Sequence, residues 1–210
     1  MMELPLYANI DEVRQAALGC RACGRAESRR QVVFGAGNPD AALMIVGEAP
    51  SSTDDTTGLP YTGPAVDLLD DLLAEAGTSR DEVWITNLPR CFEGRRRDGR
   101  IENQPARTSE IRACSRWLNL EIQYVKPHVI VAMGAPAART LISSDFKLRD
   151  KRGTIRHRPD DIRVIATSQP AYVMRLVNLV DQETAELERA RVVADLSLAV
   201  RMAKQEGPGT

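Results

Sequence analysis

A chain of 210 residues is long enough to bury a full hydrophobic core and has the size of one domain. Its composition, 43% hydrophobic and 27% charged, excludes fibrous and low-complexity proteins, and apolar segments recur along the whole chain, which excludes a disordered one. Since the chain has 28 Lys and Arg residues and 29 Asp and Glu residues, the net charge alone does not indicate a nucleic-acid partner. Only four of the basic residues are Lys, however, and Arg is the better residue for forked contacts with phosphate.

The chain begins with a predicted helix and then alternates buried strands with amphipathic helices. Residues 11–18 are expected to form a short helix that leads into the motif CRAC. Four later segments are short and rich in β-branched residues, which predicts strands that are buried on both faces. These segments are residues 43–47, 83–86, 129–133 and 162–167.

Apolar residues at helical spacing follow these strands. The predicted helices are residues 63–76, 109–124, 136–142 and 183–204. Strands that alternate with helices pair in parallel through right-handed crossovers. The expected fold is therefore α/β, a three-layer α/β/α sandwich around a central, mainly parallel four-stranded sheet. Residues 1–210 are expected to form one domain, with a frayed tail at residues 205–210.

Four cysteines need an explanation other than disulfide bonds. The chain has no run of roughly 20 apolar residues that would cross a membrane and no secretory signal at its start, so a cytoplasmic protein is expected. Structural disulfides are rare in that compartment. Four thiolates suit a closed tetrahedral zinc site or an iron–sulfur cluster, and the spacing does not choose between them. Four unrelated buried thiols are the alternative. The cysteines are Cys20, Cys23, Cys91 and Cys114.

Three predicted strands end in a polar residue beside a proline. Glu48 follows the first strand in GEAP, Asn87 the second in TNLP, and Gln169 the last in TSQP. Ligands of parallel sheets bind beyond the carboxyl ends of the strands. One such turn is typical of an ordinary loop, but three at equivalent strand ends predict a site.

The order of motifs along residues 15–200 resembles the family-4 uracil-DNA glycosylases. The shared motifs are Cys-x-x-Cys, GEAP with an acidic pair after it, GLPYTGPA, TNLPRC, a further Cys before Trp-Leu, and QPAYVMR. The resemblance implies a [4Fe-4S] cluster bound by the four cysteines. It also implies hydrolysis of the N-glycosidic bond of deoxyuridine in DNA, which leaves an abasic site and begins base excision repair.

The resemblance also implies roles for single residues. Glu48 would lie near the attacking water, with Gly47 and Ala49 beside it in the substrate pocket. Tyr61 stands where the family has a Phe that stacks on the flipped base, and Asn87 would read the amide edge of uracil. The alternatives are a Glu48 that only lies beside a helix, a Tyr61 that belongs to the core, and an Asn87 that only satisfies its own turn.

These residue types suit the chemistry of glycosidic cleavage. Positive charge develops on the sugar, which a carboxylate stabilises, and negative charge develops on the departing base, which hydrogen-bond donors stabilise. The base must leave the stack before it is reached, so an aromatic platform and an amide are expected. Asn binds both N3–H and O4 of uracil, whereas cytosine reverses that pattern of donor and acceptor.

The motif QPAYVMR differs from the family in its first residue. The family has a His that donates to uracil O2, and Gln169 replaces it with a neutral amide that offers an N–H without a charge. Arg175 matches the final Arg of the family motif. Between them, Tyr172 and its two successors resemble the loop that fills the gap left by the flipped nucleotide.

The segment FEGRRRDGRIENQ after Cys91 is longer than the usual family-4 connection. It resembles the extended loop of the UdgX-type branch, whose Arg-Ile-His triplet binds the sugar covalently. The matching triplet ends here in Glu102, which is either a second carboxylate near the sugar or a solvent-facing loop residue. No stable adduct is expected without the His. Another departure is Ser51, where the family commonly has Gly.

Two arginine-rich segments are either solvated surface or a rim that grips phosphate groups. One is residues 147–158, where a hairpin is expected around His157; the other consists of Arg95, Arg96, Arg97 and Arg100. The expected partner is DNA that contains uracil or another deaminated base, bound by a monomer. Two alternative functions stay open: a glycosylase that prefers deaminated purines, and a protein that binds uracil or abasic DNA with weak turnover.

Overall fold

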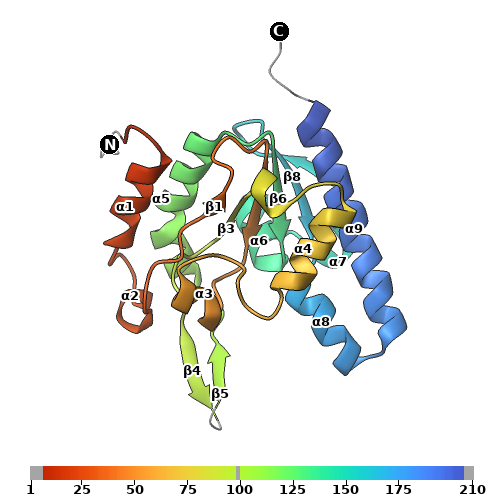
Figure 1. Ribbon diagram of the computed structural model, residues 1–210, viewed down its shortest axis with the longest axis horizontal. Coiled ribbons are helices and arrows are strands. Elements are labelled where there is room, and N and C mark those ends of the chain that lie inside the picture. The colour runs from red at the N-terminus through yellow and green to blue at the C-terminus, as the bar shows by residue number, and fades with distance from the viewer. Residues whose placement is uncertain (1–6, 98–99, 206–210) are drawn as a thin grey trace.

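The computed structural model describes residues 7–97 and 100–205 (Figure 1), without the side chains of Arg96, Arg97 and Arg100. Its centre is a six-stranded sheet with the strand order β1-β3-β2-β6-β8-β7. The four inner strands are all parallel, as predicted: β2 (Leu43–Gly47), β3 (Trp84–Asn87), β6 (Val129–Met133) and β8 (Arg163–Thr167).

Two short antiparallel strands close the edges, so the predicted count of four strands was too low. Strand β1 (Ala36–Gly37) pairs with β3, and β7 (Ile155–His157) pairs with β8. The second pair is the hairpin that the sequence predicted around His157. Short edge strands of this kind leave little unpaired backbone for another chain to pair with.

Helices cover both faces of the sheet, which confirms the three-layer arrangement (Figure 1). One face packs against α1 (Ile10–Leu18), α5 (Thr108–Val125) and α6 (Ala135–Leu141). The other packs against α4 (Val66–Glu75), α8 (Pro170–Leu179) and α9 (Gln182–Gln205). Successive strand residues alternate between the two faces, as in Met44 and Ile45 of β2, and both are fully buried.

Helix α8 corrects one expectation. The segment that begins at Tyr172 was predicted to be a gap-filling loop, but it is the first turn of a ten-residue helix. Pro170 stands at the start, where its missing N–H costs nothing, and Val173 and Leu176 are buried. In the same way α9 continues to Gln205, while residues 206–210 of the expected tail lie outside the described residues.

The remaining elements are short. They are α2 (Arg25–Ser28), α3 (Ser52–Thr57), the 3-10 helix η1 (Arg80–Glu82), α7 (Leu148–Lys151), and the antiparallel pair β4 (Gly94–Arg97) and β5 (Arg100–Asn103). The β4–β5 hairpin projects from the body of the molecule (Figure 1). Within the described ranges, no helix is both long and apolar enough to span a membrane.

Candidate active site

A cavity of about 600 Å³ lies where the carboxyl ends of β2, β3 and β8 meet. Because these strands are parallel, the residues after them reach the same edge of the sheet. The structure thus brings six of the predicted site residues to this cavity, which we call the base cavity. These residues are Glu48, Ala49, Tyr61, Asn87, Gln169 and Arg175.

Gly47 makes room in the base cavity. It pairs with Asn87 across the two parallel strands. A Cβ atom at position 47 would overlap both the Asn87 Oδ1 atom and the Tyr61 hydroxyl. Gly47 therefore acts by the absence of a side chain, which lets the amide and the phenol approach the same point.

Asn87 is not occupied by its own turn. Its side chain is 2% exposed, and within the described residues its Nδ2 atom has no hydrogen-bond partner. A buried polar group without a partner is costly and rare in folded proteins. The Asn87 amide is therefore arranged for something other than the fold.

Tyr61 has a strained backbone, with φ at 54°. Its hydroxyl donates to the Met133 sulfur at 3.7 Å. Burial raises the pKa of the Tyr61 phenol far above its usual value, and the neighbouring carboxylates of Asp54 and Glu48 raise it further, so the hydroxyl keeps its proton.

Asp54 fixes the loop that carries Tyr61, and the sequence analysis missed this role. The carboxylate of Asp54 accepts from the Thr62 amide at 2.6 Å and from the Ser51 amide at 2.8 Å. Ser51 and Asp54 form a capping box at the start of α3. The box explains why Ser51 suits a position where the family commonly has Gly, and the spacing of Ser and Asp in SSTD was the available signal.

Glu48 and Gln169 are in direct contact. The Nε2 atom of Gln169 donates to the Glu48 carboxylate at 2.7 Å. Gly134 permits this position, because a Cβ atom there would stand 2.5 Å from the Gln169 Nε2 atom. Both side chains are half-buried, so the carboxylate is oriented by the amide while one side stays accessible to a ligand.

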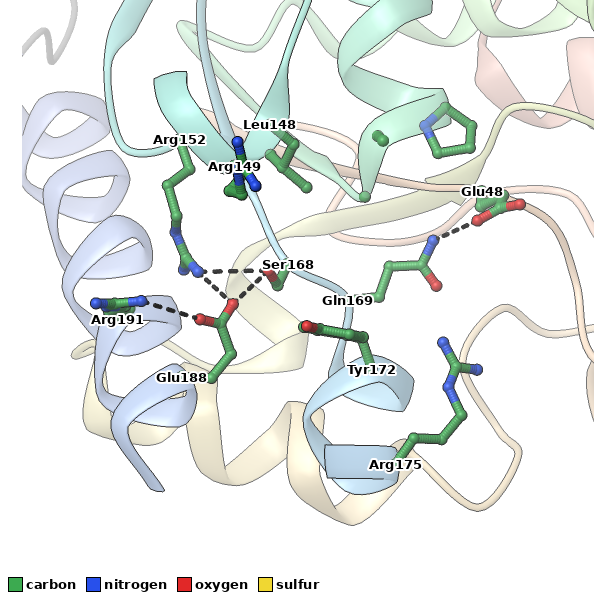
Figure 2. Close-up of a pocket in the computed structure, with 13 residues that line it drawn as sticks. Glu48, Leu148, Arg149, Arg152, Ser168, Gln169, Tyr172, Arg175, Glu188 and Arg191 are labelled. Atoms are coloured by element: carbon green, nitrogen blue, oxygen red, sulfur yellow. Dashed lines mark hydrogen bonds and ion pairs between the residues drawn. The ribbon is translucent and has the colours of Figure 1, made fainter. Parts of the chain in front are cut away.

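A second cavity of about 510 Å³ lies beyond this pair (Figure 2). Glu48, Gln169 and Arg175 line both cavities, and Tyr172 lines only the second. Its wall contains an ion network that the sequence did not reveal. Arg152 is bonded there to Glu188, to the Asp195 carboxylate at 2.8 Å and to the Thr167 hydroxyl at 3.0 Å.

The β4–β5 hairpin brings Asn103, rather than Glu102, to the base cavity. The Asn103 amide donates to the Pro50 carbonyl at 3.3 Å, which ties the hairpin to the GEAP loop. Glu102 is exposed on β5 opposite Arg95, which is also exposed, and neither lines the cavity. The position of Glu102 favours the solvent-facing alternative, and the predicted side-chain roles of Arg96, Arg97 and Arg100 lie outside the described residues.

The four cysteines surround one small cavity and are not unrelated thiols. All four are unpaired: Cys91 and Cys114 are buried, and Cys20 and Cys23 are half-buried. Burial raises the pKa of the Cys91 thiol to about 11 and also raises that of Cys114. Within the described ranges, no three His, Cys, Asp or Glu side chains are arranged to hold a metal ion.

Cationic and amide groups face these sulfurs. The Arg29 guanidinium donates to the Cys91 sulfur at 3.2 Å, and the Arg90 amide donates to the Cys114 sulfur at 3.3 Å. Hydrogen bonds of this kind stabilise thiolate sulfur. Burial still raises the pKa of Cys91 and Cys114, so their thiolate forms also need a bound cation, which a metal-containing group would supply.

Two buried arginines connect the cysteine cavity with the rest of the site. Arg90 is 1% exposed, donates to the Leu88 carbonyl at 2.9 Å and to the Asn87 carbonyl, and forms an ion pair with Glu121 at 2.9 Å. Arg25 is fully buried and pairs with Glu110 at 2.9 Å.

Arg25 also donates to the carbonyls of Cys91 at 3.2 Å and Gln104 at 3.1 Å. One arginine thus holds the strand end that carries Asn87, and the other holds the base of the hairpin.

The comparisons with known proteins agree with the motifs. The profile of the Uracil DNA glycosylase superfamily matches residues 34–195. A type-4 uracil-DNA glycosylase of Thermotoga maritima is 34% identical over 192 residues, which are 90% of this chain and 91% of that protein. One from Sulfurisphaera tokodaii is 31% identical and covers 81% and 78%, and one from Archaeoglobus fulgidus is 28% identical and covers 86% and 91%. The match along most of the chain shows that this protein belongs to the uracil-DNA glycosylase superfamily, among its type-4 members.

Proposed function

We propose that this protein hydrolyses the N-glycosidic bond of deoxyuridine in DNA and leaves an abasic site, the first step of base excision repair. The relatives with the same motifs are named for uracil-DNA glycosylase activity. The observation that carries the proposal is the unpartnered Nδ2 atom of Asn87, which is buried beside Glu48 and Tyr61 in the base cavity.

Asn87 selects the base. An amide offers one donor and one acceptor, and these match the O4 and N3–H of uracil. Cytosine presents a donor and an acceptor in the reverse order, so it would leave polar groups unpaired in a closed cavity. The Tyr61 ring supplies the flat surface on which an everted pyrimidine stacks.

Glu48 and Gln169 act on the bond that breaks. The Glu48 carboxylate stabilises the positive charge that develops on the sugar and aligns a water molecule for attack on the anomeric carbon. The Nε2 atom of Gln169 carries two hydrogens, of which one is bonded to Glu48. The other donates to uracil O2, where negative charge develops as the base departs.

The four cysteines bind a [4Fe-4S] cluster that is structural. The shared cavity and the two donors to sulfur support a group bound by all four cysteines, and the resemblance of the motifs to the family-4 enzymes favours the cluster. Unpaired cysteines also suit a reducing compartment, so we place the protein in the cytoplasm. Broad visible absorbance and about four iron atoms per chain are expected, and a colourless protein that contains zinc would contradict the cluster.

Arginines and one tyrosine hold the DNA. Arg175 lies between the two cavities, and Tyr172 lines the second. Arg95 and its neighbours Arg96, Arg97 and Arg100 belong to the projecting hairpin, whose position allows it to reach the duplex beside the everted base. Contacts of this kind go to phosphates, so binding weakens as salt rises and carries little sequence preference.

A gel assay tests the function. A labelled oligonucleotide with one uracil is incubated with the protein and then treated with alkali, which breaks the strand at an abasic site. Wild-type protein should produce the break, and Asn87→Ala should lower the rate about 100-fold or more, because uracil then loses two partners in a buried site. Asn119→Ala, which changes an exposed Asn on α5, is the matched control.

The other outcomes identify the alternatives. A retarded band without strand breaks would show binding without turnover. Breaks with hypoxanthine or xanthine DNA, but not with uracil, would show a preference for deaminated purines. Full activity of Asn87→Ala would contradict the assigned role of Asn87.

A further inference from the structure

We infer that the second cavity binds the nucleotide next to the excised one, with the neighbouring base stacked on Tyr172 and its phosphate held by arginine. The inference rests on the proposed function, because it places a second unit of the same DNA strand. The reaction proposed at the base cavity does not use the second cavity. The inference is based on the residues that line the second cavity.

The two cavities are neighbours along one path. Glu48, Gln169 and Arg175 line both of them, so the hydrogen-bonded pair of Glu48 and Gln169 forms the partition. A strand whose everted base fills the base cavity has its sugar at Glu48. The next nucleotide of the strand then lies on the other side of the partition.

The lining of the second cavity suits a nucleotide. Tyr172 is 41% exposed, and Figure 2 shows its ring extending into the cavity below Gln169 and Ser168. Leu148 and Pro136 add apolar surface. An exposed aromatic ring beside apolar side chains provides a stacking surface that accepts any base.

Arginines supply the complementary charge. Arg175 is exposed and makes no hydrogen bond or ion pair within the described residues, which leaves its guanidinium available for a phosphate. Arg149 and Arg191 are also exposed and line the cavity. Arg152 differs, because Glu188 and Asp195 already neutralise it, and its role is to hold the wall.

The helix fixes Tyr172 in this place. Val173 is buried in the core, and Met174 faces the base cavity, so Tyr172 extends on the other side of the first turns of α8. A residue anchored in this way acts as a fixed platform. It differs from the gap-filling loop that the resemblance implied, because the segment is helical.

The experiment combines substrates with protein variants. Single-stranded oligonucleotides carry one uracil, and the nucleotide on its 5′ or its 3′ side is either normal or a tetrahydrofuran abasic analogue. Dissociation constants come from fluorescence anisotropy and excision rates from the gel assay. The proteins are wild type, Tyr172→Ala, Tyr172→Phe and, as a control on the same helix, Val177→Ala, which changes an exposed residue outside both cavities.

Loss of the neighbouring base on one side should weaken binding to wild type about 10-fold, as expected for one stacked base. Tyr172→Ala should weaken binding of the normal oligonucleotide by a similar factor and should remove the dependence on that neighbour. Tyr172→Phe keeps the aromatic ring and should therefore retain the dependence on the neighbouring base, whereas Val177→Ala should behave as wild type.

Equal affinity of wild type for all three oligonucleotides would overturn the inference. So would a Tyr172→Ala protein that still loses affinity about 10-fold when the neighbour is removed. If the protein binds with this neighbour dependence but excises no base, the proposed function fails and the stacking site stands. If the protein excises uracil but shows no neighbour dependence, the proposed function stands and the stacking site fails.

Discussion

The ion pair between Arg90 and Glu121 lies in the protein interior, and substitution of its members tests how much it contributes to stability. Both side chains are 1% exposed or less, and two contacts at 2.9 and 3.2 Å join them. Arg90→Met keeps most of the volume but leaves the Glu121 carboxylate buried. Within the described residues its remaining partners are the Trp84 indole N–H at 3.2 Å and the Gly35 amide at 3.3 Å.

The expected loss follows from this geometry. Removal of one member of a buried ion pair costs about 3–5 kcal/mol, because the other charge stays uncompensated. For a chain of this length, 1 kcal/mol lowers the melting temperature by about 2–4 °C, so Arg90→Met should melt about 6–20 °C below wild type. The double variant Arg90→Met with Glu121→Leu removes both charges of this pair and should recover part of that loss, since the Trp84 indole N–H and the Gly35 amide then lack their acceptor.

Thermal unfolding followed by circular dichroism measures these differences. The control is Arg189→Met, which breaks an exposed pair with Glu75 that solvent screens, and it should melt close to wild type. Excision by Arg90→Met and by the double variant should be slower than by wild type, because neither protein has the Arg90 guanidinium that donates to the Asn87 carbonyl. The reasoning fails if Arg90→Met and Arg189→Met melt together, or if the double variant melts below Arg90→Met.

Three further predictions concern the site and its supports. Gly47→Ala should abolish most excision while the protein stays folded, because the added carbon overlaps two residues of the base cavity; Gly24→Ala, whose Cβ atom meets nothing within 4 Å, should be fully active in the same gel assay. Burial acts to raise the pKa of Glu110, but hydrogen bonds from a backbone amide and from Arg25 outweigh it and lower the pKa. The Glu110 carboxylate therefore stabilises the fold at pH values above about 4.3, its unfolded pKa, and this stabilisation is lost as the pH falls through the lowered pKa of the folded protein. Because Glu110→Gln lacks this carboxylate, its melting temperature should fall less steeply in acid than that of wild type. Arg175→Ala should reduce the slope of log affinity against log salt by about one, and an unchanged slope would remove its phosphate contact.

The sequence predicted the inner sheet well because its strands are short, mostly apolar segments that are rich in β-branched residues. Strands β2 and β6 have the predicted bounds. The edge strands β1 and β7 are two and three residues long, and β7 is exposed along its length, so neither has an apolar pattern. Helix α8 carried a signal in Pro170, Val173 and Leu176, which the resemblance to a loop obscured.

The base cavity was predictable for a topological reason. Parallel strands end at one edge, so Glu48, Asn87 and Gln169 had to be neighbours once the strands were identified. The supports were not predictable in this way. Arg90 and Glu121 are 31 positions apart, and Arg25 and Glu110 are 85 positions apart, so only the packing of α2 and α5 against the strand ends brings them together.

The position that the side chain of residue 169 can occupy depends on the residue at position 134, which is Gly134. Its φ is 93°, a conformation that other residues rarely adopt, and any side chain there would push the amide of Gln169 away from its carboxylate. Directed evolution that seeks a histidine at position 169 thus has a narrow route. Libraries that retain the glycine leave room beside Glu48 for the side chain of residue 169, whereas side chains introduced at position 134 would occupy that space.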